Sequence, residues 1–224
     1  MSSAQTLPML KRVLLVVGSV LLIDQIVKIY IKLNFRIGER FPVLKEVFEI
    51  HFIENKGMAF GMEIPSAWGK IALSLFRIVA VVVISLYLRR IIREGAHKGF
   101  VTCVALILAG AVGNIIDSAF YGMLFSTSSI VQAATLLPPD GGYAPFLHGD
   151  VVDMLHFTVK WPSWLGGNGI NEIFPPIFNI ADAAITVGVI WILIRQRVYF
   201  AKPEEEKSEE PEVAGNSEEG AVQA

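Results

Sequence analysis

Residues 10–31 read LKRVLLVVGSVLLIDQIVKIYI, an apolar run that two charged groups interrupt near its end. About 20 apolar residues are needed for a helix to cross the hydrocarbon of a bilayer. A cleavable signal peptide is the alternative, but the run continues through Asp24, Gln25 and Lys28 with no small-residue cleavage site. The stretch therefore predicts an uncleaved first membrane span.

The rest of the chain repeats this pattern three times. Further apolar blocks of similar length occupy residues 68–88, 100–121 and 177–194. Of the 224 residues, 53% are hydrophobic and 18% are charged, whereas about a quarter of a soluble domain is charged. The single cysteine, Cys103, cannot form an internal disulfide and is expected to serve packing. We predict an integral membrane α-helical protein with four transmembrane helices.

Basic residues in the short flanks of the blocks predict the orientation. They gather before the first block, between the second and third, and after the fourth, and cytoplasmic flanks carry such an excess. Both termini are therefore expected in the cytoplasm, with residues 32–67 and 122–176 on the outer, periplasmic face. We divide the chain into a cytoplasmic N-terminus (1–9), a membrane domain (10–200) and a Glu-rich tail (201–224) that is expected to be disordered. The basic residues are Lys11, Arg12, Arg89, Arg90, Arg93, Lys98, Arg195, Arg197 and Lys202.

The two outer segments differ in character. Residues 48–52 alternate apolar and polar side chains, a period of two that predicts a β-strand, and Asn55-Lys56-Gly57 is typical of a turn. We expect a small amphipathic sheet that rests on the membrane surface. The second segment is rich in Gly and Pro and is expected to be a long loop, with Trp161 and Trp164 at the membrane interface.

Polar groups inside the blocks converge on one depth. A charged group within a span is costly and needs a reason. With a rise of about 1.5 Å per residue, these groups fall near the outer ends of their helices, and Asp153 lies in the outer loop that returns to the fourth block. Asp24 and Lys28 are four residues apart on one helical face and are expected to pair; Asn114 is either an interhelical hydrogen-bonding residue or part of a site. The polar groups are Asp24, Lys28, Asn114, Asp117 and Asp182, together with Arg77 near the middle of the second block, for which the sequence suggests no function.

Two carboxylates in a partly dry site favour one kind of chemistry. Both cannot ionise easily, so one keeps a proton while the other acts as a base that activates water against an amide carbonyl. This is aspartic-peptidase chemistry, and it needs no metal or cofactor. No H-E-x-x-H or G-x-S-x-G motif is present, and the four histidines have no zinc-ligand spacing. A serine–lysine pair of Ser118 and Lys28 remains an open alternative.

Five sequence runs that carry these polar groups resemble one family. In this order along the chain, they resemble the motifs of bacterial lipoprotein signal peptidase, also called signal peptidase II. Together they extend over roughly residues 24–190, and five runs in order are far more specific than any one alone. They are Asp24-Gln25-x-x-Lys28, Glu54-Asn55-Lys56-Gly57-Met58-Ala59-Phe60-Gly61, Gly110-Ala111-Val112-Gly113-Asn114-Ile115-Ile116-Asp117, Val151-Val152-Asp153-Met154 and Phe178-Asn179-Ile180-Ala181-Asp182.

The resemblance implies an activity and a set of site residues. Asp153 and Asp182 would be the catalytic pair of an aspartic endopeptidase in the bacterial inner membrane. Its substrates would be prolipoproteins whose cysteine already carries diacylglycerol, cut just before that cysteine. The partners expected are these substrates and membrane lipids, with no nucleic acid, no cofactor and no metal, and the enzyme is expected to be a monomer. Residues implied in substrate binding or support are Asn55, Gly57, Asn114, Asp117, Asn179, Asp24 and Lys28.

The chain departs from the family pattern in two places. The family commonly has Arg where this chain has Ser118, and residues 123–148 form an insertion that we expect to be an extra outer loop near the site.

One rival interpretation of the function is a small ion- or proton-coupled transporter with Asp24, Asp117 and Asp182 as a relay, which predicts polar groups through the whole bilayer depth. The other is a different intramembrane aspartyl peptidase, weakly suggested by residues 148–150.

Overall fold

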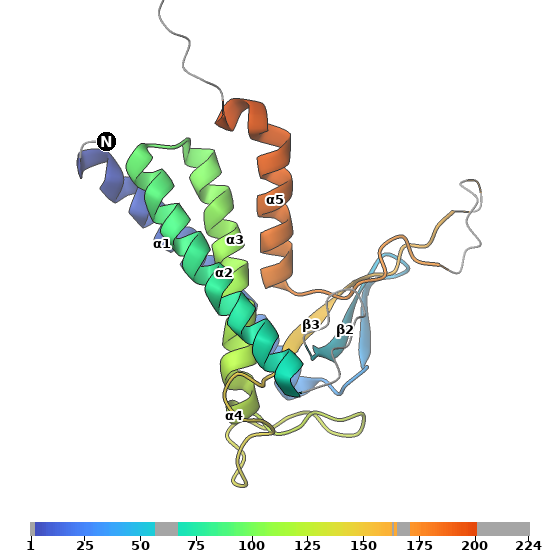
Figure 1. The fold of residues 1–224 in the computed structure, drawn as a ribbon. Helices are drawn as coiled ribbons and strands as arrows, with labels where there is room; N and C mark the ends of the chain where they lie inside the picture. Colours follow the sequence, from blue (N-terminus) through green and yellow to red (C-terminus); the bar gives the residue numbers. More distant parts are fainter. Residues whose placement is uncertain (1–2, 57–66, 163, 165–170, 201–224) are drawn as a thin grey trace, which may run out of the picture.

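The computed structural model describes residues 3–56, 67–162, 164 and 171–200. Four long helices stand side by side, and a small sheet lies against one end of them (Figure 1). The elements in chain order are α1 (Ser3–Asn34), β1 (Arg40–Leu44), β2 (Phe48–Asn55), α2 (Ala67–Glu94), α3 (Lys98–Ile116), the π-helical turn η1 (Asp117–Tyr121), α4 (Gly122–Leu124), β3 (Val151–Phe157) and α5 (Ile180–Tyr199).

Three helical stretches are long and apolar enough to cross a membrane, at Thr6–Asn34, Gly69–Glu94 and Lys98–Leu124. Their outward faces expose large apolar side chains such as Leu15 and Phe76, each 69% exposed. Asp24, Lys28 and Asp117 are instead buried inside the bundle. Apolar surface outside and paired charges inside are what a lipid solvent requires, and the chain is a multi-pass membrane protein.

Helix α5 begins at Ile180, three residues after the start that the sequence predicted for the fourth block. Asn179 has extended backbone angles, φ −122° and ψ −179°, and its side chain caps the helix. Gly110 allows α5 to pack closely on α3, because a Cβ there would lie 2.2 Å from the carbonyl oxygen of Ala181. The helix is 20 residues long and carries its charged residues near its ends.

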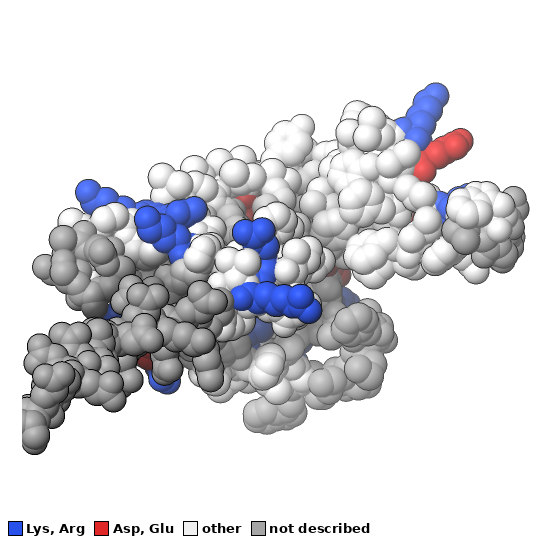
Figure 2. All heavy atoms as spheres, turned by 90° about the horizontal axis from the view of Figure 1, so that it is seen from above, with Lys and Arg blue, Asp and Glu red and all other residues white. Residues whose placement is uncertain are grey.

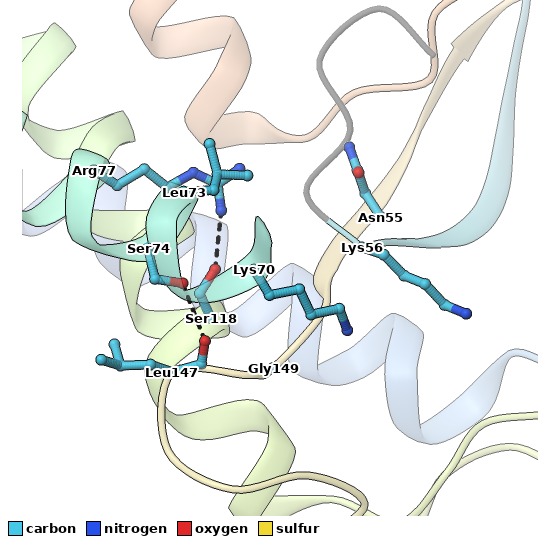
Figure 3. A pocket seen from close by; sticks show the side chains of 9 residues that line it. All are labelled: Asn55, Lys56, Lys70, Leu73, Ser74, Arg77, Ser118, Leu147 and Gly149. Atoms are coloured by element: carbon cyan, nitrogen blue, oxygen red, sulfur yellow. Dashed lines mark hydrogen bonds between the residues drawn. The ribbon is translucent and has the colours of Figure 1, made fainter. Parts of the chain in front are cut away.

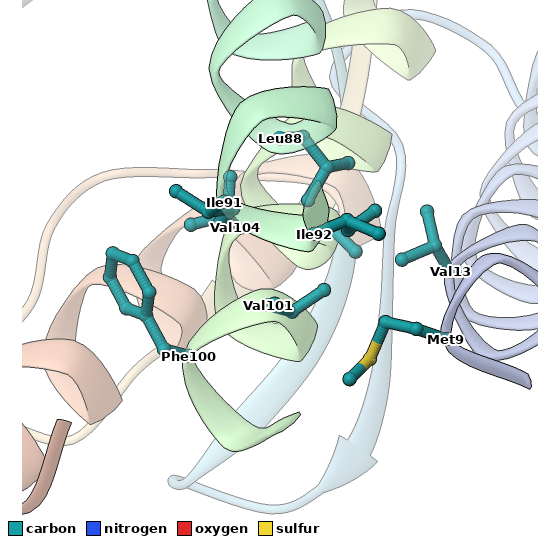
Figure 4. Packing of buried hydrophobic residues seen from close by; sticks show 9 residues of the cluster. Met9, Val13, Leu88, Ile91, Ile92, Phe100, Val101 and Val104 are labelled. Atoms are coloured by element: carbon teal, nitrogen blue, oxygen red, sulfur yellow. The ribbon is translucent and has the colours of Figure 1, made fainter. Parts of the chain in front are cut away.

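The bundle has an apolar core at the end that holds the N-terminus. Side chains of α1, α2 and α3 meet there (Figure 4), and the short connection from α2 to α3 closes this end (Figure 1). Exposed Lys and Arg surround it, and Figure 2, viewed onto this end, shows more Lys and Arg than Asp and Glu on the described surface. The core residues are Met9, Val13, Leu88, Ile91, Ile92, Phe100, Val101, Val104 and Ala105.

The sheet at the opposite end is antiparallel with the order β1-β2-β3. The predicted strand around residues 48–52 is confirmed as part of β2. Placing Asp153 in a loop was wrong, because it lies on β3 opposite Ile53, beyond a register shift that follows Ile50. The buried Phe52 and Met154 belong to a second core, which packs the sheet against η1 and the end of α1 that holds Ile31.

The insertion at residues 123–148 folds onto this second core. Phe125 and Ala134 are buried in it, and Ala134 N–H donates to the carbonyl of Lys32 at the end of α1 (3.2 Å). The Lys32 ammonium binds Glu54 of β2 and donates to Ser128 of the insertion. The insertion is therefore packed against α1 and the sheet.

Candidate active site

Strand β3 and the start of α5 bring two aspartates together. Phe178, just before α5, pairs with Leu155 of β3 through two hydrogen bonds of 2.8 and 3.0 Å. This pairing holds Asn179 alongside β3. The Asn179 Oδ1 then accepts from the Asp182 N–H (2.9 Å), and Asp182 Oδ2 accepts in return from the Asn179 N–H (3.4 Å). This reciprocal capping satisfies N–H groups at the helix start and fixes the Asp182 side chain.

Side-chain amides link the two carboxylates. Asn179 Nδ2 donates to Asp153 Oδ1 (2.6 Å) and to Asn114 Oδ1 (3.1 Å). Asn114 Nδ2 donates in turn to Asp182 Oδ1 (2.8 Å). The other oxygen of Asp153 accepts from Asn55 Nδ2 of β2 (3.1 Å). Each carboxylate is thus oriented by an amide, and a continuous set of hydrogen bonds connects β2, β3, α3 and α5.

A buried lysine lies behind this set. Lys28 Nζ contacts Asp24 Oδ2 (3.0 Å), Asp117 Oδ2 (2.8 Å) and Asn114 Oδ1 (2.9 Å), and the side chains of the three charged residues are fully buried. The predicted Asp24–Lys28 pair is therefore present, extended by a second carboxylate. Hydrogen bonds to charged partners are worth about 1.5–3 kcal/mol each, and removing one member of a buried ion pair is strongly destabilising.

Asp117 and Asp24 hold the backbone next to Asp153 and Asp182, which are the candidate catalytic dyad. Asp117 Oδ2 accepts from the N–H of Val152, the residue before Asp153 (3.2 Å). Asp24 Oδ1 accepts from the N–H of Ala181, the residue before Asp182 (2.9 Å). The buried network therefore positions the strand and the helix that carry the dyad relative to each other.

Burial makes Asp153 a poor place for a charge. It is 1% exposed, and burial, followed by repulsion from Asp182, raises the pKa of Asp153 from 3.8 to about 7. The hydrogen bonds from Asn55 and Asn179 oppose this rise. Asp182 occupies the first turn of α5, where the helix dipole favours a negative charge. The two carboxyl groups therefore lie in different environments, because Asp153 is buried and Asp182 is partly exposed at the start of α5.

A pocket opens beside Asn55, between α2 and the end of β2 (Figure 3). Arg77 reaches into it from α2, and its Nη1 donates to Ser118 Oγ (3.0 Å). Ser118 lies in η1, and π-helical turns often mark functional sites. Among the described residues no carboxylate lies within ion-pairing distance of Arg77, which lines the pocket. The lining residues are Asn55, Lys56, Lys70, Leu73, Ser74, Arg77, Ser118, Leu147 and Gly149.

Most of the site residues expected from the sequence meet in one cluster. Gly57 alone lies outside the described residues. The serine–lysine alternative lacks support, because Ser118 bonds Arg77 and the carbonyl of Asn114 while Lys28 contacts two carboxylates. Gln25 of the first motif was not among the predicted site residues, yet it donates to Asp117 (3.0 Å) and Asp24 (3.1 Å). The clustered residues are Asp24, Lys28, Asn55, Asn114, Asp117, Asp153, Asn179 and Asp182.

Comparison with known proteins gives a consistent result. Residues 16–198 match a family described as signal peptidase (SPase) II. The lipoprotein signal peptidase of Porphyromonas gingivalis is 44% identical over 194 residues, covering 84% of each chain, and that of Amoebophilus asiaticus is 31% identical over 190 residues, covering 81% of this chain and 75% of that protein. A solved structure described as a bacterial membrane enzyme is 26% identical, covers 87% of this chain and 93% of its own, and superposes with a TM-score of 0.56.

Proposed function

The chain belongs to the signal peptidase II family, and we propose that Asp153 and Asp182 are the two carboxylates with which it works. It is an aspartic endopeptidase that removes signal peptides from diacylglyceryl-modified prolipoproteins, cleaving just before the lipidated cysteine. The observation that carries the dyad assignment is the amide connection between the two side chains, in which Asn179 donates to Asp153 and Asn114 donates to Asp182.

The two carboxylates divide the reaction between them. Asp182 takes a proton from water as the water oxygen attacks the scissile carbonyl carbon, and protonated Asp153 gives its proton to the carbonyl oxygen. The resulting tetrahedral diol collapses when Asp153 takes a hydroxyl proton back and Asp182 passes its proton to the amide nitrogen. The C–N bond breaks, leaving a carboxyl end on the signal peptide and a free amino group on the lipidated cysteine.

Substitution of each aspartate by asparagine tests the assignment. Asparagine keeps the size of the side chain and an oxygen that can accept the bonds from Asn179 or Asn114, so Asp153→Asn and Asp182→Asn are expected to fold. Each should lower turnover of a diacylglyceryl prolipoprotein in detergent by about 10²- to 10⁴-fold or more. The matched control is Asp140→Asn, at an exposed position of the outer insertion, which should keep full activity. Efficient cleavage by either dyad variant would overturn the assignment.

We propose that Arg77 contacts the substrate near the scissile bond. Its guanidinium lies in the pocket next to Asn55. Asn55 also donates a hydrogen bond to Asp153. The family commonly has Arg at the position of Ser118. Arg77 of α2 places a positive charge next to this position, because it donates to Ser118. Peptide carbonyl oxygens of the substrate can accept from its remaining N–H donors. Arg77→Lys should raise KM while leaving the unfolding temperature near that of the wild type.

We propose that α5 is a fourth membrane span and that both termini are cytoplasmic. Twenty residues of helix extend over about 30 Å, the thickness of the hydrocarbon. Lys and Arg are frequent at the end that holds the N-terminus (Figure 2), and the sheet with β3, which carries Asp153, lies at the other end (Figure 1). Because cytoplasmic flanks carry an excess of basic residues, this supports a periplasmic position for the sheet in the bacterial inner membrane. A diacylglyceryl group anchored in the outer leaflet would then lie at the depth of the dyad.

We further propose that one chain is a complete catalytic unit. Asp153, Asp182 and the amides that orient them all come from the same chain, so a monomer suffices. Residues 10–200 would form this unit, with residues 1–9 and 201–224 as cytoplasmic extensions. The exposed Trp164 and Phe174 of the second outer segment fit contact with lipid headgroups.

A further inference from the structure

A second group of titratable side chains lies on the sheet, apart from the aspartate dyad. Glu49 of β2 and His156 of β3 are directly opposite each other, and His51 follows Glu49 by two residues, on the same face of the strand. His156 is three residues from Asp153 along β3, roughly 10 Å. His156 Nδ1 lies 2.9 Å from Glu49 Oε1, and its Nε2 lies 3.0 Å from Glu172 Oε2.

His51 has a buried nitrogen that the described part of the chain leaves without a hydrogen bond. Its Nδ1 has no hydrogen-bond partner, and Glu49 Oε1 is 3.9 Å away, beyond hydrogen-bonding distance. The side chain of His51 is 12% exposed. Buried polar atoms are rarely left unsatisfied in native proteins, and an unplaced ion is one of the common explanations.

We propose that Glu49, His51 and His156 bind a divalent transition-metal ion, with Zn²⁺ the best match to two imidazoles and a carboxylate. One ligand atom from each residue lies within 4.8 Å of the others. Tetrahedral Zn²⁺ with bonds near 2.0–2.1 Å holds its ligand atoms about 3.3 Å apart. Small side-chain movements would therefore complete the site, and Glu172, bonded to His156 Nε2, is placed to orient His156.

The surrounding charges favour a cation. The carboxylates of Glu49 and Glu172 carry two negative charges, against one positive charge on Arg40, which is 3.3 Å from Glu49 Oε1. The Arg40 side chain is 56% exposed, so it can turn into solvent when an ion binds. A metal would exchange the His156–Glu49 hydrogen bond for two stronger bonds to the ion.

The metal would fasten the second outer segment to the sheet that carries Asp153. Glu172 lies on a stretch that pairs with the chain just after β3, since Ile173 N–H donates to the carbonyl of Val159 (2.7 Å) and Trp161 N–H donates to that of Asn171 (3.0 Å). An ion held by β2 and β3, with Glu172 bonded to the ligand His156, would link these three parts of the surface. The site is separate from the dyad chemistry, which uses no metal.

Cobalt spectroscopy on the purified full-length protein tests the site. Protein carrying a tag without histidine would be stripped with a chelator and titrated with Co²⁺ alone, whose d–d absorption is intense only in a tetrahedral site. We expect one saturable equivalent per chain, displaced by Zn²⁺. His51→Gln should weaken Co²⁺ binding at least tenfold, and because its Nδ1 makes no hydrogen bond, the fold should survive.

Matched variants separate this site from other binding. His148→Gln changes a half-buried histidine at the end of the insertion, outside the cluster of Glu49, His51 and His156, and should leave the Co²⁺ spectrum and affinity unchanged. Zn²⁺ should also raise the unfolding temperature of the wild type and of His148→Gln, but not that of His51→Gln. The proposal is wrong if the wild type shows no tetrahedral Co²⁺ spectrum, or if His51→Gln binds as tightly as the wild type. In either case the cluster is a hydrogen-bonded network around His156.

Discussion

Asn179 has two roles that one substitution can separate. Its Oδ1 caps α5 by accepting from the Asp182 N–H, and its Nδ2 donates to Asp153 and Asn114. Serine ranks with asparagine as a helix N-cap, but its hydroxyl is too short to reach both acceptors. Asn179→Ser should therefore keep the unfolding temperature and lose the donation to Asp153. Asp153 is protonated in the proposed mechanism, so this is a hydrogen bond to a neutral group. Such a bond is worth about 0.5–1.5 kcal/mol, which predicts a fall in kcat of about 2- to 12-fold.

A pH profile and a second variant complete this test. The bond from Asn179 lowers the pKa of Asp153, so its loss should raise that pKa and move the alkaline fall in kcat to higher pH. Asn179→Ala also removes the cap, so it should cost about 0.5–2 kcal/mol more in unfolding free energy than Asn179→Ser. The reasoning fails if Asn179→Ser turns over a diacylglyceryl prolipoprotein like the wild type. It also fails if both variants lose activity only in proportion to stability.

Three further predictions follow from the same geometry. In the wild type, kcat should fall as pH rises through about 7, where Asp153 loses its proton. Because folding raises the pKa of Asp153 above 3.8, the stability that this proton contributes is complete below about pH 4 and is lost as pH rises to about 7. Thermal unfolding measured across this pH range would detect the loss. Lys28→Met leaves two buried carboxylates without their cation and should cost about 3–5 kcal/mol of unfolding free energy, whereas Lys11→Met on the exposed basic flank should cost almost nothing; equal unfolding temperatures would contradict this. Gly110→Ala should force α3 away from α5 and cost about 1–3 kcal/mol along with activity, while Gly18→Ala, where a Cβ meets no atom within 4 Å, should be neutral or slightly stabilising.

The sequence predicted the helices well because their signal is local. Each block is a continuous apolar run, so its position is visible without knowledge of its neighbours. The common depth of Asp24, Asn114 and Asp182 followed from the helical rise alone. The start of α5 could also have been found, because Asn179 with Asp182 three residues later is an N-terminal capping pattern, which argues for a helix beginning at residue 180.

Features that depend on distant pairing could not be found in this way. Val151–Phe157 has no strict alternation, and its strand character comes from pairing with β2, about 100 residues earlier. The contact of Arg77 with Ser118 joins two different helices. The histidine cluster likewise needs the register of β2 and β3, since His51 and His156 share no local motif. In each case the missing information is which segments lie side by side.

The buried charges explain how the two carboxylates of the proposed dyad can be positioned together although one lies on β3 and the other on α5. Asp153 and Asp182 belong to elements with separate cores, so packing alone would let the strand and the helix shift relative to each other. Lys28 draws Asp24 and Asp117 together, and each of these carboxylates holds the backbone N–H before one dyad residue. Replacing the network by apolar side chains could preserve stability, but it would remove both backbone anchors. We therefore infer that the network maintains the geometry of the dyad. A variant in which apolar side chains replace Asp24, Lys28 and Asp117 should remain folded but lose turnover.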